Sequence, residues 1–162
     1  MFNTIYNSIR TSNSIRTNNI SNNYNKIIEY LFIGNIQAAE LYSDRFALVV
    51  NCSKDIPFSP KSRQKIRIPI NDDPSETNTL LNYMKNTDIL EQIHTNVINK
   101  RPVLVHCFAG MQRSCAVVAC YLIKYYNATP LIAINFIKKQ RKEAFFGGVN
   151  FINTLEMFYA TK

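Results

Sequence analysis

One segment of the chain carries residues whose types and spacing suit phosphoryl transfer. Cys107 follows an apolar run and His106, Arg113 stands six residues later, and Ser114 comes next. A strand that leads through a short loop into a helix gathers backbone N–H groups around one point at the helix N-terminus, where they bind an anion such as phosphate. The partial positive charge of these N–H groups also favours the thiolate form of Cys107, which is the form that attacks phosphorus. The Arg113 guanidinium can hold two phosphate oxygens. We therefore predict covalent phosphoryl transfer at Cys107.

The loop itself should bind the substrate phosphate through its backbone. Its members are Phe108, Ala109, Gly110, Met111, Gln112 and Arg113. Ser114 can donate a hydrogen bond to the Cys107 sulfur when that sulfur leaves, and His106 is expected to order the loop rather than to transfer protons. A lone cysteine after a buried strand is usually a core residue, but the pattern H-C-x5-R-S in this context rarely arises by chance.

The elements that must position this loop alternate between strands and helices. Apolar runs predict strands over residues 27–33, 46–51, 66–70 and 102–105, with Pro69 placing the third near an edge or a strand end. Three- and four-residue spacing predicts a helix of about five turns over residues 80–97, a deeply buried helix over 114–126 and a last helix over about 150–159. Asn127 is a candidate left-handed C-cap, and Thr129 with Pro130 opens a further helix. Strands interspersed with helices predict an α/β domain.

Composition narrows the class of protein. The chain has 162 residues, of which 46% are hydrophobic and 19% charged, as expected for one globular domain. Charged residues interrupt every apolar stretch, which excludes a membrane-spanning helix. The four cysteines form no C-x-x-C pair and only two histidines occur, so we expect no metal or other cofactor and free thiols in a reducing compartment, the cytoplasm. The net charge of +8 favours acidic partners such as phosphorylated substrates.

Residues 1–26 differ from the rest, because 15 of the 26 are Ser, Thr or Asn and no acidic residue precedes Glu29. We interpret them as an N-terminal arm ahead of a catalytic domain over residues 27–162. The arm is a flexible polar extension, an organelle transit peptide, or a helix that docks on a partner subunit. Phe2, Ile5, Tyr6 and Ile9 would share one helical face, which suggests a homodimer to which this helix contributes.

The active-site segment resembles that of the cysteine-based protein phosphatases, specifically the small dual-specificity branch. The resemblance extends over residues 27–160: residues 30–34 and 49–53 look like the first strands of that branch, 68–73 like its acid-bearing segment, and 139–151 like its penultimate helix and closing turn. It implies a central mixed sheet of four or five strands flanked by helices, and hydrolysis of phosphotyrosine and of phosphoserine or phosphothreonine through a phosphocysteine intermediate. Gln112 stands where the family often has a small hydroxyl residue.

The departing oxygen also needs a proton, which a carboxylic acid must supply because the only histidines are His94 and His106. The resemblance assigns this role to Asp72, with Asp73 as the alternative after a one-residue shift in register. It also places Arg141, in a basic run, beside the mouth of the site, where the side chain could steer acidic substrates toward it.

Three other functions fit parts of the pattern. The charge of +8 allows an RNA 5′-phosphatase on the same fold, although the loop residues Phe108, Ala109, Met111 and Gln112 are uncharged and therefore disfavour a nucleic acid or a phosphoinositide. A non-catalytic phosphate-binding module would not need Cys107, Arg113 and an aspartate together, and a sulfurtransferase would need neither the aspartate nor the Arg-Ser pair.

Overall fold

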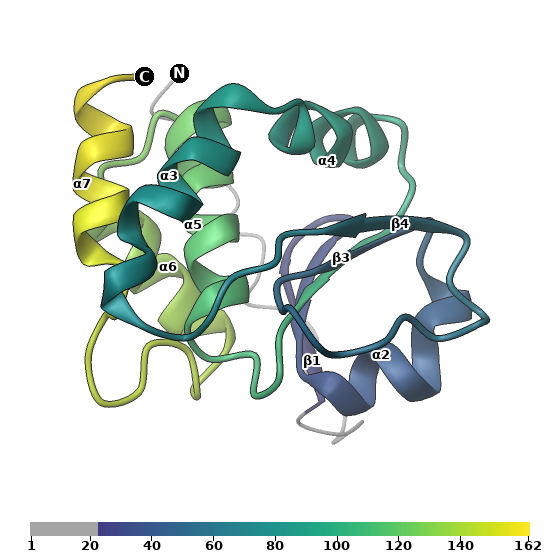
Figure 1. The fold of residues 1–162 in the computed structure, drawn as a ribbon. Helices are drawn as coiled ribbons and strands as arrows, with labels where there is room; N and C mark the ends of the chain where they lie inside the picture. Colours follow the sequence, from purple (N-terminus) through teal and green to yellow (C-terminus); the bar gives the residue numbers. More distant parts are fainter. Residues whose placement is uncertain (1–22) are drawn as a thin grey trace.

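A mixed five-stranded sheet forms the centre of the structure (Figure 1). The structure is a computed structural model and describes residues 23–162. The strands lie in the order β1-β2-β5-β3-β4; β1 is antiparallel to β2, and the other neighbours are parallel. Their bounds are β1 Tyr24–Ile28, β2 Leu31–Gly34, β3 Leu48–Asn51, β4 Gln64–Arg67 and β5 Val103–His106. This architecture confirms the predicted mixed sheet flanked by helices.

Helices cover both faces of the sheet. Figure 1 shows α2 (Ile36–Tyr42) on one side and the other helices gathered on the opposite side. These are α3 Thr77–Asn86, α4 Ile89–Ile98, α5 Arg113–Tyr125, α6 Pro130–Gln140 and α7 Ile152–Ala160, with short 3-10 turns at Ser43–Arg45 (η1) and Pro74–Glu76 (η2). Side chains alternate along β5, so Leu104 packs in the smaller core beside α2 while Val103 and Val105 enter the larger core on the other side.

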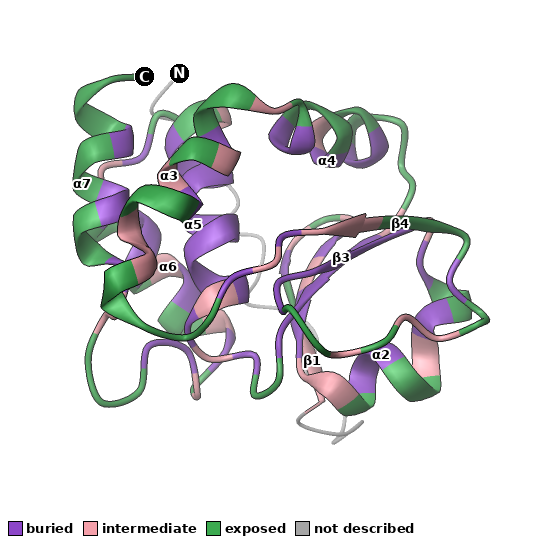
Figure 2. Cartoon of the chain, in the orientation of Figure 1, coloured by how far each residue is buried: buried purple, intermediate pink, exposed green. Residues whose placement is uncertain are grey.

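Helix α5 is the centre of the larger core. Every residue from Ser114 to Ile123 is buried, and Figure 2 shows this helix as mostly buried while the outer face of α7 is exposed. Asn127 follows with a φ of 53°, and the Thr129 hydroxyl accepts a hydrogen bond from Ile132 N at the start of α6. The predicted deep helix, its left-handed end and the next N-cap are all confirmed. Within residues 23–162, no helix combines the length and apolarity needed to cross a membrane.

Several predicted boundaries are wrong. The expected strand over residues 27–33 is a hairpin, because Tyr30 adopts a φ of +66° and turns β1 back into β2. The expected five-turn helix over 80–97 is two helices, α3 and α4, because Thr87 is extended and its hydroxyl donates to Tyr83 O. Helix α2 was not predicted. Strand β1 begins at Tyr24, inside the predicted arm, and residues 1–22 of that arm lie outside the described residues.

Candidate active site

The carboxyl ends of four parallel strands meet at one edge of the sheet. Gly34 of β2 and Asn51 of β3 both pair with His106 of β5, and Asn51 also pairs with Arg67 of β4. The loop from Cys107 to Gln112 leaves this edge and enters α5, and the segment 68–73 leaves it beside that loop. The carboxyl ends of strands in such α/β sheets are where ligands bind, so the topology alone brings the predicted residues to one place.

Four consecutive carbonyl groups of the loop face outward, because each accepts a hydrogen bond from outside the loop. The bonds are Ile36 N to Phe108 O (3.0 Å), Arg141 Nη2 to Ala109 O (3.2 Å), Arg141 Nε to Gly110 O (2.7 Å) and Phe145 N to Met111 O (2.8 Å). In a trans peptide the N–H points opposite to the C=O, so the N–H groups that follow these carbonyls turn toward the centre of the loop. Such a ring of N–H groups at a helix N-terminus binds an anion.

Gly110 is the residue that allows this loop to close. Its φ is +65°, and a Cβ built on it would lie 2.5 Å from Gly34 O and 2.8 Å from Arg141 Nη2. Both the backbone conformation and the contact with the end of β2 therefore require glycine.

The sulfur of Cys107 lies where the loop and α5 meet. Gly110 N donates to Cys107 Sγ at 3.2 Å, and Ser114 Oγ lies 3.3 Å from the same sulfur. Arg113 Nη1 donates to Ile70 O at 3.2 Å, whereas its buried Nε has no hydrogen-bond partner among residues 23–162. The structure thus brings together Cys107, Arg113 and Ser114 as predicted, with a guanidinium donor available beside the anion-binding loop.

The predicted steering role of Arg141 is wrong. The side chain is 1% exposed and its guanidinium is used within the fold: besides its two bonds to the loop, Nη1 donates to Asn25 Oδ1 at 2.7 Å. A buried guanidinium in these bonds cannot meet an approaching substrate. Arg141 instead joins α6, β1 and the loop of residues 107–112, and so fixes the shape of that loop.

The two candidate acids are in different environments. The Asp73 carboxylate accepts a hydrogen bond from Ser75 N at 2.8 Å, which caps η2 and lowers the pKa of Asp73 below its ordinary value. A general acid must hold its proton at the working pH, so this carboxyl is poorly suited to the role. The exposed Asp72 makes a different contact, in which Oδ1 accepts from Asn150 Nδ2 at 2.9 Å.

His106 lies behind the loop, fully buried in the sheet. Its Nδ1 is 3.4 Å from Cys107 O, and its Nε2 has no hydrogen-bond partner among the described residues. Burial lowers the pKa of His106 to about 4, and the charges of Arg67 and Arg113 act in the same direction. The imidazole is therefore neutral near pH 7, which supports its interpretation as a residue that orders the loop.

This buried histidine should make the folded protein sensitive to mild acid. Its pKa is lower in the folded chain than the ordinary value of about 6.5, so protons bind the unfolded chain preferentially as the pH falls from about 6.5 toward 4. We expect this residue alone to remove about 2 kcal/mol of stability between pH 7 and pH 5. Urea unfolding of the wild-type protein and of His106→Asn at both pH values measures the difference, and an equal pH dependence in the two proteins would refute it.

Two residues near the loop were not singled out by the sequence for the contacts that they make. Gln112 was expected to bind phosphate through its backbone, yet its buried side chain reaches residues 146–150, and Asn150 in turn contacts Asp72. Asn150 belongs to no recognisable motif, and for Gln112 the only sequence signal was an unusual residue before Arg113 in the H-C-x5-R-S pattern.

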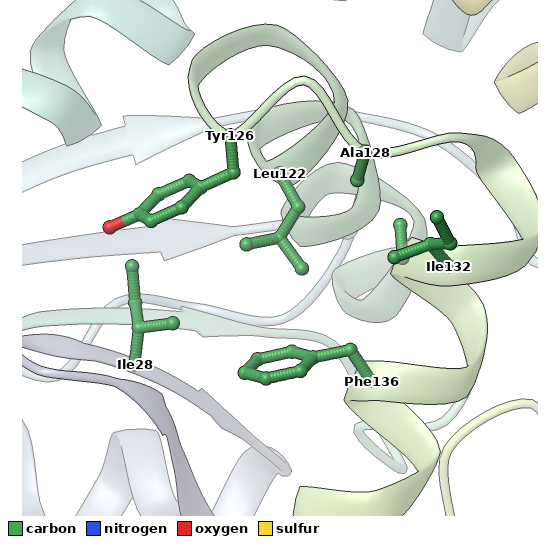
Figure 3. A pocket seen from close by; sticks show the side chains of 7 residues that line it. Ile28, Leu122, Tyr126, Ala128, Ile132 and Phe136 are labelled. Carbon is green, nitrogen blue, oxygen red and sulfur yellow. The ribbon is translucent and has the colours of Figure 1, made fainter. Parts of the chain in front are cut away.

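An apolar pocket lies elsewhere in the molecule (Figure 3). It is lined by Ile28, Leu122, Tyr126, Ala128, Ile132, Ala133 and Phe136. None of the candidate catalytic residues lines it. Residues 23–162 also contain no cluster of three or more His, Cys, Asp or Glu side chains that could hold a metal ion.

Comparison with known sequences agrees with this site. Residues 31–161 match the family model described as the dual specificity phosphatase catalytic domain. The chain is 34% identical over 137 residues to the protein named tyrosine phosphatase 123R from invertebrate iridescent virus 6, covering 82% of this chain and 89% of that protein. It is 29% identical over 123 residues to human dual specificity protein phosphatase 21, covering 73% of this chain and 63% of that relative.

Solved structures show the same fold. A mouse protein described as a dual specificity phosphatase, solved in complex with zinc tungstate, superposes with a TM-score of 0.75 at 28% identity, covering 91% of this chain and 94% of that one. Human DUSP28 gives a TM-score of 0.73 at 26% identity, covering 85% and 93% of the two chains.

Proposed function

The chain belongs to the dual specificity phosphatase family and carries a protein phosphatase domain, and from this premise we propose that it hydrolyses phosphotyrosine and phosphoserine or phosphothreonine through a phosphocysteine intermediate. The main support for the proposal is the geometry of the loop that follows Cys107. Its carbonyls point outward into hydrogen bonds, and Gly110 N donates to the Cys107 sulfur. Backbone N–H groups and Arg113 would bind the phosphate dianion, and the thiolate of Cys107 would lie beneath its phosphorus atom.

The first step forms a bond between Cys107 Sγ and phosphorus and breaks the bond from phosphorus to the substrate oxygen. Asp72 would give its proton to that oxygen, which leaves as an alcohol or phenol. In the second step the Asp72 carboxylate takes a proton from water, whose oxygen bonds to phosphorus as the S–P bond breaks. Ser114 Oγ, 3.3 Å from the sulfur, would stabilise the departing thiolate by donating a hydrogen bond to it.

Exposed aromatic side chains support a protein substrate. Phe108 in the loop is 62% exposed and Phe146, whose carbonyl accepts from Gln112 Nε2 at 3.2 Å, is 75% exposed. An apolar rim suits the ring of phosphotyrosine and apolar flanking residues better than it suits a nucleic acid.

A parallel assay tests the proposal. The protein is incubated with EDTA and, separately, with a phosphotyrosine peptide, a phosphothreonine peptide and a 5′-triphosphate RNA. We expect release of phosphate from both peptides and a much slower reaction with the RNA. Preferential hydrolysis of the RNA would replace the proposal with the RNA 5′-phosphatase alternative, and no hydrolysis of any substrate would support a phosphate-binding module.

A second thiol, that of Cys52, comes from the end of the strand that neighbours β5. Cys52 directly follows β3, its N–H donates to His106 O at 2.8 Å, and its side chain lies in the same core cluster as Cys107. The Ser53 hydroxyl instead donates to Asn51 Oδ1 at 2.6 Å. Burial raises the pKa of Cys52 well above its ordinary value, and the charge of Cys107 adds to this effect. Cys52 would therefore remain protonated while Cys107 is a thiolate, and it would have to give up its proton as it attacks an oxidised Cys107.

Mild peroxide should inactivate the protein reversibly. Peroxide would convert the Cys107 thiolate to a sulfenic acid with release of hydroxide, and the Cys52 thiol would displace water from it to form a disulfide. We expect a loss of about 2 Da mapped to Cys52 and Cys107, and recovery of activity with a thiol reductant. Cys52→Ser should instead accumulate sulfinic and sulfonic Cys107. A disulfide to Cys115, or no bridge in the wild-type protein, would contradict the pairing.

The four cysteines are buried free thiols, and we propose that the protein acts in a reducing compartment, the cytoplasm. Oxidation of Cys107 would then be transient, because cellular thiols restore it.

We also propose that residues 1–22 contribute to a homodimer. Their few apolar side chains cannot offset about 1–2 kcal/mol of backbone entropy per residue, so any order requires a surface, and a second copy supplies one. A shortened chain should begin at Asn23, because Asn35 N donates to Asn23 O at 2.9 Å. Size-exclusion chromatography with light scattering should show a dimer for the full chain and an active monomer for the shortened one. The same oligomeric state for both chains would refute a role of residues 1–22 in assembly.

A further inference from the structure

The Gln112 side chain makes contacts that a phosphate-binding loop does not need. It is 6% exposed, and its Nε2 donates to Gly148 O at 2.8 Å and to Phe146 O at 3.2 Å. Its Oε1 accepts from Asn150 N at 3.1 Å. A serine or threonine at this position would be too short to make these bonds. The glutamine therefore ties the loop to the connection between α6 and α7.

That connection depends on such bonds for its shape. Gly147 and Gly148 have φ values of 80° and 128°, and a Cβ on either would meet no atom within 4 Å. Two adjacent glycines in open space give the backbone wide conformational freedom. Gln112 bonds to three successive parts of this segment and thereby limits the positions that Asn150 can occupy.

Asn150 links this segment to Asp72 through a hydrogen bond. Its backbone N–H is held by Gln112, while its side-chain Nδ2 donates to Asp72 Oδ1 at 2.9 Å. Asp72 is exposed, and an exposed carboxylate otherwise samples several rotamers. Because Asn150 holds Oδ1, Oδ2 is the oxygen that would carry the proton to the leaving group.

We propose that Gln112 is a positioning residue for the general acid, acting through Asn150 on Asp72. The proposal rests on the proposed role of Asp72. In this proposal Gln112 belongs to the loop that binds phosphate and also aligns Asp72, the acid that protonates the leaving group.

The test separates proton transfer from phosphate binding. kcat/KM is measured for a phosphoserine peptide, whose leaving oxygen needs a proton, and for an activated aryl phosphate, whose leaving group does not. We expect Asp72→Ala to lose about 100-fold on the peptide and little on the aryl phosphate. Gln112→Met and Asn150→Ala should each lose about tenfold on the peptide only. Neither change should lower activity further when combined with Asp72→Ala.

Asn153→Ala is the matched control, since Asn153 is an exposed asparagine in the first turn of α7 and should behave like the wild-type protein. Equal losses on both substrates in Gln112→Met and in Asn150→Ala would mean that they act on the loop itself and would overturn the inference. Asn150→Ala carries the test alone if Gln112→Met does not fold, because it leaves the buried glutamine in place. Should Asp72→Ala show no dependence on the leaving group, the acid role of Asp72 fails and the inference fails with it.

Discussion

Replacing Cys107 with serine should lower kcat/KM on a phosphotyrosine peptide by at least about 1,000-fold, because a hydroxyl at this position is not ionised and attacks phosphorus poorly. Anion binding should survive. The carbonyls of the loop are held by Ile36, Arg141 and Phe145, none of which needs the sulfur. Calorimetric titration with tungstate should therefore give similar affinities for the variant and the wild-type protein.

Cys120→Ala is the matched control for this experiment. Cys120 is another buried thiol, in α5, but it belongs to the core and not to the loop, so activity should stay within about twofold. Residual activity above a few per cent in Cys107→Ser would exclude the phosphocysteine mechanism. A loss of tungstate binding in that variant would show that the sulfur also maintains the shape of the loop.

Replacing Arg113 with lysine should cost on the order of 1,000-fold in kcat/KM although the charge is kept. A lysine cannot hold two phosphate oxygens in one plane, and it would not reproduce the donor geometry of a guanidinium whose Nη1 is held by Ile70 O and whose Nε lies buried beside the loop. The loss should be equal for peptides and activated aryl phosphates, because every substrate passes through the same charge distribution at phosphorus. This distinguishes Arg113 from Asp72.

Steady-state kinetics on both substrate types checks the expectation, with the exposed Arg101→Lys as the matched control. A loss below about tenfold in Arg113→Lys would mean that the backbone N–H groups stabilise the transition state without a planar guanidinium. A loss confined to the peptides would assign Arg113 to leaving-group departure instead.

The loop over residues 107–113 could be predicted from the sequence because its residues are close together in the chain. Cys107, Arg113 and Ser114 are placed by the consecutive strand, loop and helix that contain them, and the apolar pattern of α5 determines its burial. The hairpin at Tyr30 and the break at Thr87 were missed for a different reason. Each depends on the backbone of a single residue, a positive φ at Tyr30 and an extended conformation at Thr87, which hydrophobic periodicity does not register.

Arg141 and Gln112 show why the rest of the site could not be predicted. An arginine in a basic run at the end of a helix is usually exposed. Arg141 is instead buried and donates to the carbonyls of Ala109 and Gly110, which lie 32 and 31 positions earlier in the chain. The partners of Gln112 lie 34 to 38 positions later. Contacts between residues so far apart leave no periodic pattern in the sequence. They become visible only in the folded chain.

The outward-facing carbonyls of the loop also bear on how the protein becomes active as it folds. Their donors come from residues 36, 141 and 145, so the loop has its shape only after the start of α2, the end of α6 and the following turn have docked against it. Contacts this distant in sequence form late, and partly folded chains should lack them. Regain of phosphatase activity during refolding should therefore lag behind the recovery of helical circular dichroism, so that enzymatic activity reports the completion of folding.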